Sequence, residues 1–451
     1  MRRMFRATRW FVTLGVVVLG SLAPAWAQST ATLQGTITDT QSAVMPGVSV
    51  TIRNQATGIE RATVTDAAGQ YVAASLQPGH YAIVAHIEGF QDQTREVDLS
   101  PAQTVELNLR LGVAALAENV TVSGSSPLID TATVSVGQAM AERTVQEIPL
   151  NGRHFVDLGP LMPGGSTAPQ NAGLSAPLRG QGSFSFMSAG NRETSVNFMI
   201  NGINLNDLSN SQVTFQPSIN TVSEFKVDNS TFSAEYGRNS GAIVNVATRS
   251  GSNAMHGEAF DFYRDDKYDS RNYFNPPSAP QSVFNRKQFG VNLGGPIAKN
   301  RTFYFLSYEG LRHLQAVDLN SGTLTPAQRA AVTDPLAKRL LQYIPEANDS
   351  TGSRVIGSAL APVNIDQYTM DLRHNLRQND EFHWYYAFQR DLRQEPNAQG
   401  NTVPGYGDQR GAHRQVMTVN ETHVFSPALV NEVRVGFNRI FGIDQTFGQR
   451  R

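Results

Sequence analysis

The C-terminal half of the chain alternates apolar and polar side chains, which predicts β-strands with two different faces. In one run, apolar Phe289, Val291 and Leu293 are separated by polar or small residues. The same alternation occurs in residues 367–376, 381–389 and 431–438. It is typical of transmembrane β-barrels, but a sheet covering a soluble core has the same period. The aromatic-rich runs 256–274 and 301–309 favour barrel strands.

A different pattern appears within residues 311–362, between two of these strand regions. Thr325 precedes Pro326, which is a favourable helix start, and residues 335–344 form a second helical stretch. Outer-membrane barrels carry their long loops on the extracellular side. We therefore expect this insert to be an extracellular loop with one or two short helices.

Residues 1–27 have the pattern of a signal peptide. Several arginines precede an apolar stretch over residues 11–23, and Ala25-Trp26-Ala27 fits a small-x-small cleavage site. The apolar stretch is shorter than the ~20 residues of a membrane-spanning helix. No later segment is long and apolar enough to span as a helix. We expect export, and any membrane span must then be a β-barrel.

Composition narrows the function classes further. The 451 residues contain 37 Lys and Arg, 38 Asp and Glu, and no Cys. The length predicts about three domains. The balanced charge gives no support for nucleic-acid binding, and the lack of Cys excludes disulfides, thiolate zinc sites and Cys nucleophiles.

Catalytic motifs are absent from the sequence. The nine histidines form no HxxE or HExxH pair, and there is no GxSxG, GxxxxGK[ST] or strand-following GxGxxG motif. We therefore expect no enzymatic activity, no catalytic or metal-binding residues, and no cofactor.

Residues 32–110 predict a small β-sandwich, because short β-rich runs alternate with turns such as Pro46-Gly47 and Pro78-Gly79. The order of these motifs resembles the carboxypeptidase regulatory-like, or transthyretin-like, domain. The residues that carry the resemblance are Gly35, Asp39, Pro46, Gly47, Asn54, Thr65, Asp66, Gly69, Tyr71, Leu76, Pro78, Gly79, Tyr81, Gly89 and Phe90. The glycines and aspartates among them have an ordinary role as turn residues.

The linker of residues 111–124 contains one short segment with the pattern of an extended strand, and it is a candidate binding segment. Its residues are Glu118, Asn119, Val120, Thr121, Val122 and Ser123. It resembles the TonB box of TonB-dependent outer-membrane receptors. Such a segment can add as a strand to the sheet edge of another protein. Valines at alternate positions also occur in ordinary edge strands. The resemblance to a TonB box is therefore supported mainly by the position of the segment, directly before the next domain.

Residues 125–251 resemble the plug domain of those receptors. Asn201-Gly202 stands where the family has Asp-Gly, and it keeps the chemistry of a hairpin turn. Residues 233–251 follow the YGxxxGGxINxxTKxG ending of the plug, with Gly-Ala in place of Gly-Gly. Residues 148–155 resemble the Oar-like subgroup.

Within this plug ending, Glu235, Tyr236 and Arg238 are possible ligand contacts. We favour a structural role, since Tyr-Gly before a β-run is usually a turn and its packing.

The strand count suggests an incomplete barrel. Residues 252–451 hold about seven strands, whereas barrels that enclose a plug have ~22. The chain is expected to be truncated or a fragment.

Taken together, we expect a mainly β protein with a signal peptide, a sandwich, an α+β plug and an incomplete antiparallel barrel. The expected boundaries are 1–27, 32–110, 111–124, 125–251 and 252–451. The resemblance implies uptake or binding of an unidentified solute, such as a glycan, a peptide or a siderophore, at the outer membrane. It also implies a TonB-type energy-transducing partner in the periplasm, where the N-terminal domain would lie, and contact with outer-membrane lipid. The alternative is a surface or secreted carbohydrate-binding adhesin without transport.

Overall fold

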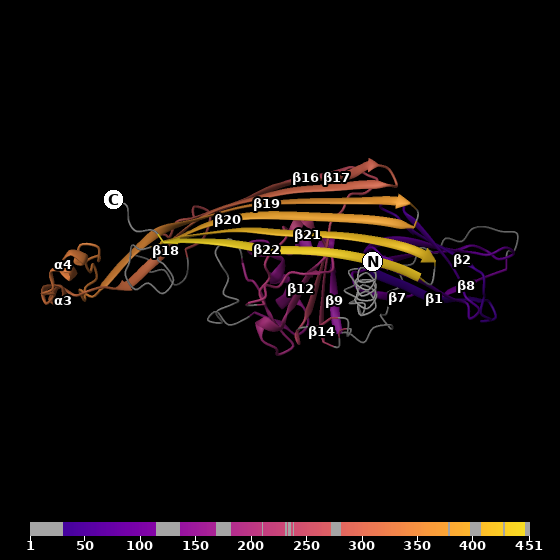
Figure 1. The fold of residues 1–451 in the computed structure, drawn as a ribbon, viewed down its shortest axis with the longest axis horizontal. Coiled ribbons are helices and arrows are strands. Elements are labelled where there is room, and N and C mark those ends of the chain that lie inside the picture. Colours follow the sequence, from indigo (N-terminus) through magenta and orange to yellow (C-terminus); the bar gives the residue numbers. More distant parts are fainter. Residues whose placement is uncertain are drawn as a thin grey trace, which may run out of the picture.

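The computed structural model describes residues 30–113, 136–167, 182–209, 211–230, 232, 236–237, 239–271, 281–377, 379–396, 407–426 and 429–446. The expected fold class is confirmed: a long antiparallel sheet arches over a plug-like α+β unit, and a sandwich lies at one end (Figure 1). The expected signal peptide, residues 1–27, lies outside the described residues. The expected domain boundaries stay predictions.

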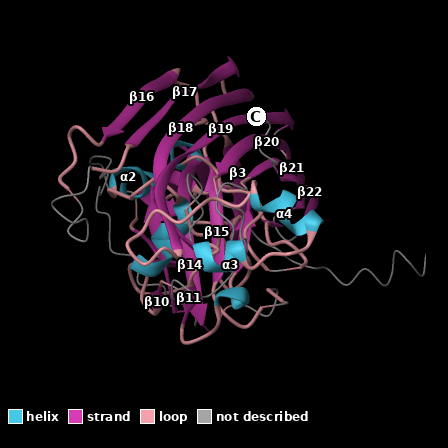
Figure 2. Cartoon of the chain, turned by 90° about the vertical axis from the view of Figure 1, so that its left-hand side faces the viewer, coloured by secondary structure: helices cyan, strands magenta, loops and turns pink. Residues whose placement is uncertain are grey.

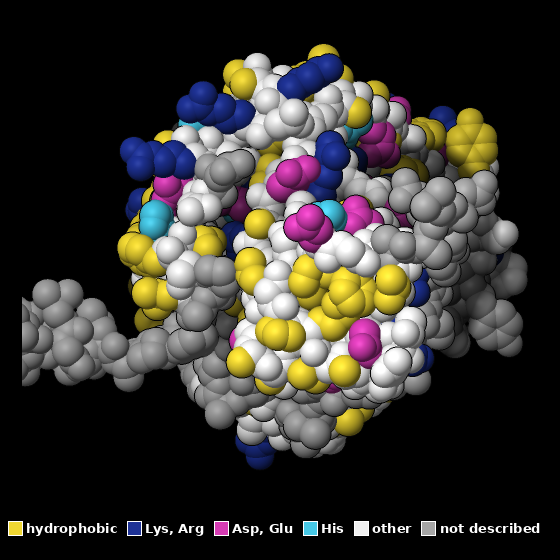
Figure 3. Space-filling model, turned by 90° about the vertical axis from the view of Figure 1, so that its right-hand side faces the viewer, with side chains coloured by type: hydrophobic (Ala, Val, Ile, Leu, Met, Phe, Trp, Pro, Cys, Tyr) yellow, Lys and Arg dark blue, Asp and Glu magenta, His cyan; other side chains and the backbone are white. Residues whose placement is uncertain are grey.

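The N-terminal unit consists of two packed four-stranded sheets. One contains β1 (Ala31–Asp39), β4 (Gln70–Leu76), β7 (Thr104–Glu106) and β8 (Leu109–Leu111). The other has the order β3 (Glu60–Val64), β2 (Ser49–Asn54), β5 (Gly79–His86) and β6 (Gln93–Leu99). Alternate residues such as Leu33, Ile52 and Ile83 are fully buried between the sheets. The outward face mixes hydrophobic side chains with charges of both signs (Figure 3).

The middle unit, called the plug here, is built on a five-stranded sheet with the order β13-β12-β15-β14-β9. Its elements are β9 (Val136–Ala141), α2 (Glu142–Glu147), η1 (Phe155–Leu161), β10 (Gly165–Ser166), β11 (Met187–Ser188), η2 (Glu193–Ser195), β12 (Asn197–Ile200), β13 (Ile203–Asn204), η3 (Ile219–Thr221), β14 (Val222–Ser230) and β15 (Ile243–Thr248). Phe155, Phe186 and Phe198 pack edge to face in its core. Asn201 and Gly202 both have positive φ, at 46° and 81°, and close the β12–β13 hairpin as expected.

The C-terminal unit is one seven-stranded antiparallel sheet in chain order. Its strands are β16 (His256–Asp265), β17 (Phe284–Ala298), β18 (Thr302–Gly322), β19 (Arg354–Arg377), β20 (Asp380–Glu395), β21 (Asp408–Ser426) and β22 (Leu429–Thr446). It curves around the plug strands β14 and β15 (Figure 2), and its outer strands β16 and β22 are not paired with each other. Short connections lie at the end next to the sandwich, which we call the short-turn end (Figure 1).

The insert between β18 and β19 lies at the opposite end of the sheet (Figure 1). It contains α3 (Pro326–Ala330) and α4 (Pro335–Leu341), so the two short helices are confirmed. Thr325 and Gln328 form a reciprocal capping box at α3, and the Asp334 carboxylate accepts two backbone N–H groups at α4. Among the described residues, no helix combines the length and apolar composition needed to cross a bilayer.

Alternation along the strands separates an outer face from a plug-facing face. On β20, His383, Tyr385 and Gln389 are buried toward the plug, whereas Trp384 and Tyr386 lie on the outer face. The same separation leaves Val433, Val435 and Phe437 of β22 between 45% and 55% exposed. Such an outward apolar band is suited to contact with lipid.

We predict that Val435→Arg destabilises the membrane-inserted chain by roughly 2–4 kcal/mol, because it places a cation on the lipid-facing band. Urea unfolding of the full chain in lipid vesicles would measure the effect. Leu340→Arg, at an exposed position of α4, is the control and should change stability little. Equal effects of the two variants would contradict a lipid-facing role of Val435.

Candidate functional site

The residues expected to bind the partner, Glu118 to Ser123, lie outside the described residues and stay a prediction. Glu235 and Arg238 also lie outside them. Tyr236 is described: it is 8% exposed and packs with Met199 and Ile243, beside Ala102 of the sandwich. This position supports the structural role that we favoured for it.

The main candidate site is the contact surface between the plug and the sheet that curves around it. Gln367 of β19 binds the plug segment of residues 214–218 with both ends of its amide: Oε1 accepts from the Ser218 backbone N–H at 2.5 Å, and Nε2 donates to the Gln216 carbonyl at 2.8 Å. The Gln367 side chain is buried. Because a buried amide without partners is costly, Gln367 fixes the position of this segment.

Two further residues of the seven-stranded sheet, called the wall below, hold the same plug segment at Thr214. Arg414 of β21 donates to the Thr214 carbonyl at 2.5 Å, and the Thr214 hydroxyl donates to Asn438 of β22 at 2.7 Å. Arg414 is also paired with Asp391 at 3.2 Å, so its buried charge is compensated. The segment is therefore attached to three strands of the wall, β19, β21 and β22.

A third contact lies where the chain leaves the plug and enters the sheet. The Ser250 hydroxyl donates to Asp371 Oδ1 at 2.6 Å, and Asp371 Oδ2 lies 2.6 Å from His383 Nε2. Both Asp371 and His383 are buried. The preceding residue, Arg249, pairs with Glu142 at 3.1 Å and lies over the Phe305 ring. These contacts tie the end of the plug to the wall.

Polar side chains enclose a small cavity of about 50 Å³ at this contact surface. Arg153, His154, Gln288 and Glu309 are among its lining residues. Burial and the nearby charge of Arg286 lower the pKa of His154 to about 3. The cavity has room for a few waters.

The sandwich is docked on both other units. Lys226 of the plug donates to the Ala102 carbonyl at 3.0 Å. At the short-turn end of the sheet, Asn253 binds the backbone carbonyls of Ala56 at 3.0 Å and Thr57 at 2.7 Å. The chain between Val113 and Val136, which includes the box-like segment, therefore connects two units that are also in direct contact.

One plug carboxyl in this interface has a strongly shifted pKa. Burial raises the pKa of Glu224 to about 7, although a hydrogen bond with Ser100 of the sandwich and the charge of Lys226 oppose the shift. Glu224 therefore titrates close to neutral pH where sandwich and plug meet.

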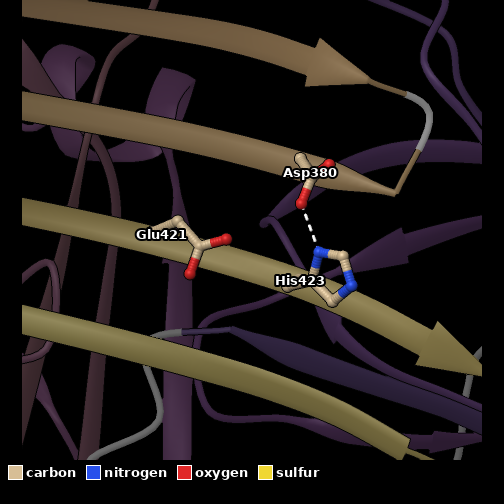
Figure 4. A group of neighbouring side chains, drawn as sticks. All are labelled: Asp380, Glu421 and His423. Carbon is tan, nitrogen blue, oxygen red and sulfur yellow. Dashed lines mark hydrogen bonds and ion pairs between the residues drawn. The ribbon is translucent and has the colours of Figure 1, made fainter.

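Asp380, Glu421 and His423 are close enough to hold a divalent cation (Figure 4). Their ligand atoms lie within 4.8 Å of one another, on neighbouring strands β20 and β21. His423 Nδ1 already bonds Asp380, which gives both groups a partner without a metal. From the sequence we expect no metal-binding residues, and the hydrogen bond between His423 and Asp380 accounts for this group without an ion.

Sequence reasoning had placed Gln367 and Asp371 on a polar strand face, but it did not identify their plug partners. Ser218 and Thr214 carry no local signal of this role. Their partners lie 149 and 224 residues away in the chain, so only the folded arrangement shows the contact.

Comparisons with known proteins agree with this architecture. A family model described as an outer membrane beta barrel domain matches residues 247–333 and 330–451, and a carboxypeptidase regulatory-like domain matches residues 32–112. The TonB-dependent transporter Oar of Myxococcus xanthus is 27% identical over 380 residues, which cover 78% of this chain and 34% of that protein. The chain thus spans about a third of the length of this curated relative.

Two solved structures show partial likeness. The siderophore receptor PirA from Acinetobacter baumannii has 13% identity and a TM-score of 0.34, with 69% of this chain and 48% of that chain covered. Catechol 1,2-dioxygenase from Acinetobacter radioresistens has 14% identity and a TM-score of 0.17, with 21% of this chain and 57% of that chain covered. TM-scores this low carry no information on function.

The chain is homologous to the TonB-dependent transporter Oar, and its match to the carboxypeptidase regulatory-like domain precedes its match to the outer membrane beta barrel domain. Its location is the outer membrane. The curated relative is described as a transporter.

The shifted carboxyl in the sandwich–plug interface gives a prediction on pH dependence. The folded state keeps the Glu224 proton up to about pH 7, whereas the unfolded chain loses it near the ordinary value of about 4.3. The stability that comes from neutral Glu224 is therefore present below about pH 4.3 and lost as pH rises to about 7. Glu224→Gln should remove this loss and stabilise the chain above pH 7 by at most about 4 kcal/mol.

Thermal unfolding of the full chain in detergent at acidic and neutral pH would measure this change. Glu88→Gln, an exposed position in the sandwich, is the matched control. A constant difference between Glu224→Gln and the natural chain across the pH range would contradict the assignment.

Proposed function

We propose that this chain acts in energy-dependent uptake of a solute across the outer membrane. In this proposal the plug is the movable element, and residues 118–123 bind a TonB-type protein in the periplasm. The observation that supports it most is the attachment of the plug to the wall through discrete polar contacts at Gln367, Arg414 and Asp371. If the plug moves and water enters, each of these polar groups can exchange its partner for water, at a net cost of about 0.5–1.5 kcal/mol per hydrogen bond.

A pull on the box-like segment would act first on β9. This strand begins at Val136, twelve residues after the end of the linker, and among the described strands it pairs with β14 alone, at the edge of the plug sheet. Most of β9 is exposed, and Met140 is its buried residue. An edge strand with so little buried surface opens before a core does.

The plug core would resist the same pull. Phe155, Phe198 and Phe225 are fully buried and pack edge to face. Removing such side chains from their contacts costs several kcal/mol each. Force that enters through β9 would therefore displace the plug edge and its wall contacts while the aromatic core stays folded.

We predict that Val120→Pro and Val122→Pro each weaken binding to the periplasmic C-terminal domain of a TonB-type protein by at least about tenfold. Proline removes a backbone N–H that strand addition needs, and it fixes the backbone angle φ. Calorimetry with the purified full chain in detergent would measure the affinity.

Ser126→Pro, which lies outside the box-like segment, is the matched control and should bind normally. The chain has no Cys, so Val122→Cys also allows site-specific disulfide cross-linking to the partner. Normal binding by both box variants would contradict the proposal. Adhesion to glycans without any partner binding would favour the adhesin instead.

A further inference from the structure

A pocket of about 510 Å³ lies between the plug and the first two strands of the sheet. Plug residues 146–153 form one side of it, and residues of β16 and β17 form the other, including Phe262, Arg264 and Arg286. This volume is within the range of small-molecule sites. The plug side carries the Ile148-to-Arg153 stretch, whose function the sequence did not reveal.

Two arginines of the pocket lack a carboxylate partner. Arg153 donates to the Asn220 side chain and lies over the Phe262 ring, with its guanidinium carbon 4.2 Å from the ring centroid. Arg286 donates to the Gly152 carbonyl at 3.3 Å. Among the described residues, no carboxylate lies within 4.0 Å of either guanidinium, and the Arg153 Nε is buried without a hydrogen-bond partner.

The third arginine that lines the pocket is neutralised. Arg264, at the rim of the pocket, pairs with Asp269 at 2.8 Å. Glu309 is the acidic group that most affects Arg153, and it is engaged by the side chains of Ser218 and Gln288. Arg153 and Arg286 therefore form a local excess of positive charge.

The backbone holds these two cations together at a local conformational cost. Gly152 has φ of +102°, and a Cβ there would meet the Arg286 guanidinium at 2.8 Å. Arg153 itself has φ of 59°, which is unfavourable for a residue with a side chain. Backbone strain of this kind costs of the order of 1–3 kcal/mol and is concentrated at functional sites.

A partly buried guanidinium without a counter-ion is unfavourable, and an incoming anion would relieve that cost. Guanidinium groups bind carboxylates and phosphates with two parallel hydrogen bonds. The Phe262 ring, 47% exposed, offers an apolar surface next to the charge. The pocket thus combines charge for an anionic group with a ring for an adjoining apolar part.

We propose that this pocket binds an anionic solute that carries a carboxylate or a phosphate, with Arg153 and Arg286 on the anionic group and Phe262 against its apolar part. The proposal rests on the proposed function, because it names the chemical class of the solute. It does not depend on the partner or on energy supply.

The test is equilibrium binding to the purified full chain in detergent. N-acetylphenylalanine and its amide form the carboxylate pair of probes, and phenyl phosphate and phenol form the phosphate pair. We expect at least one anionic probe to bind at least about tenfold more tightly than its neutral analogue, with an affinity that falls as salt is added. Which pair shows the difference identifies the anion.

The variants Arg286→Gln and Arg153→Gln should each reduce this preference about tenfold or more. Lys287→Gln is the matched control, because it removes the same charge from the next residue, which points to the outer face beside Tyr263. Arg286→Lys keeps the charge without the bidentate geometry and should give an intermediate affinity.

The proposal is overturned if the anionic and neutral probes bind equally, or if Lys287→Gln reduces binding as much as Arg286→Gln does. The comparison of probes on the natural chain needs no variant, so misfolding of a variant does not decide the result. Anion binding without any TonB-type interaction would refute the proposed function alone, and the converse would refute the pocket alone.

Discussion

The structure depends on one constraint: each strand of the seven-stranded sheet has to satisfy lipid on one face and the plug on the other. On β19, Tyr368 and Met370 lie on the outer face, about 45% and 43% exposed, whereas Gln367 and Thr369 are buried toward the plug. Because side chains alternate with a period of two, a shift of one residue would exchange the faces. The register of the strands, the polar contacts that hold the plug and the lining of the pocket therefore all depend on this alternation.

This constraint also explains which features of the structure can be predicted from the sequence. Alternation is local, so the strands and their two faces can be identified without a structure, and Asn201-Gly202 specifies its hairpin through backbone preferences. The partners of these faces are not local. Nothing near Gln367 in the sequence points to Ser218, and nothing near Lys226 points to Ala102 of the sandwich. Such pairs depend on how three separately patterned units pack together.

Cations on the plug-facing surface need anionic partners, and in the part of the chain that the structure describes only some of them have one. Arg414 forms a salt bridge with Asp391, and Arg249 forms one with Glu142. We therefore assign these two cations to the attachment of the plug. Arg153 and Arg286 lie at the same contact surface without such partners among the described residues. Because an uncompensated cation inside a protein costs stability, its retention beside an open pocket is better explained by a ligand than by packing.

In the proposed function, the docked sandwich determines on which part of the molecule a pull on the linker acts. It is hydrogen-bonded to the plug through Ala102 and to the short-turn end of the sheet through Thr57. A pull on the chain between Val113 and Val136 therefore acts on one side against a unit fixed to the wall, and on the other against the edge strand β9. On the plug side, Met140 is the buried residue of β9, so this edge strand has little buried surface to resist the pull. In the proposed function, a pull on this linker would therefore reach the plug through β9, the edge strand of its sheet.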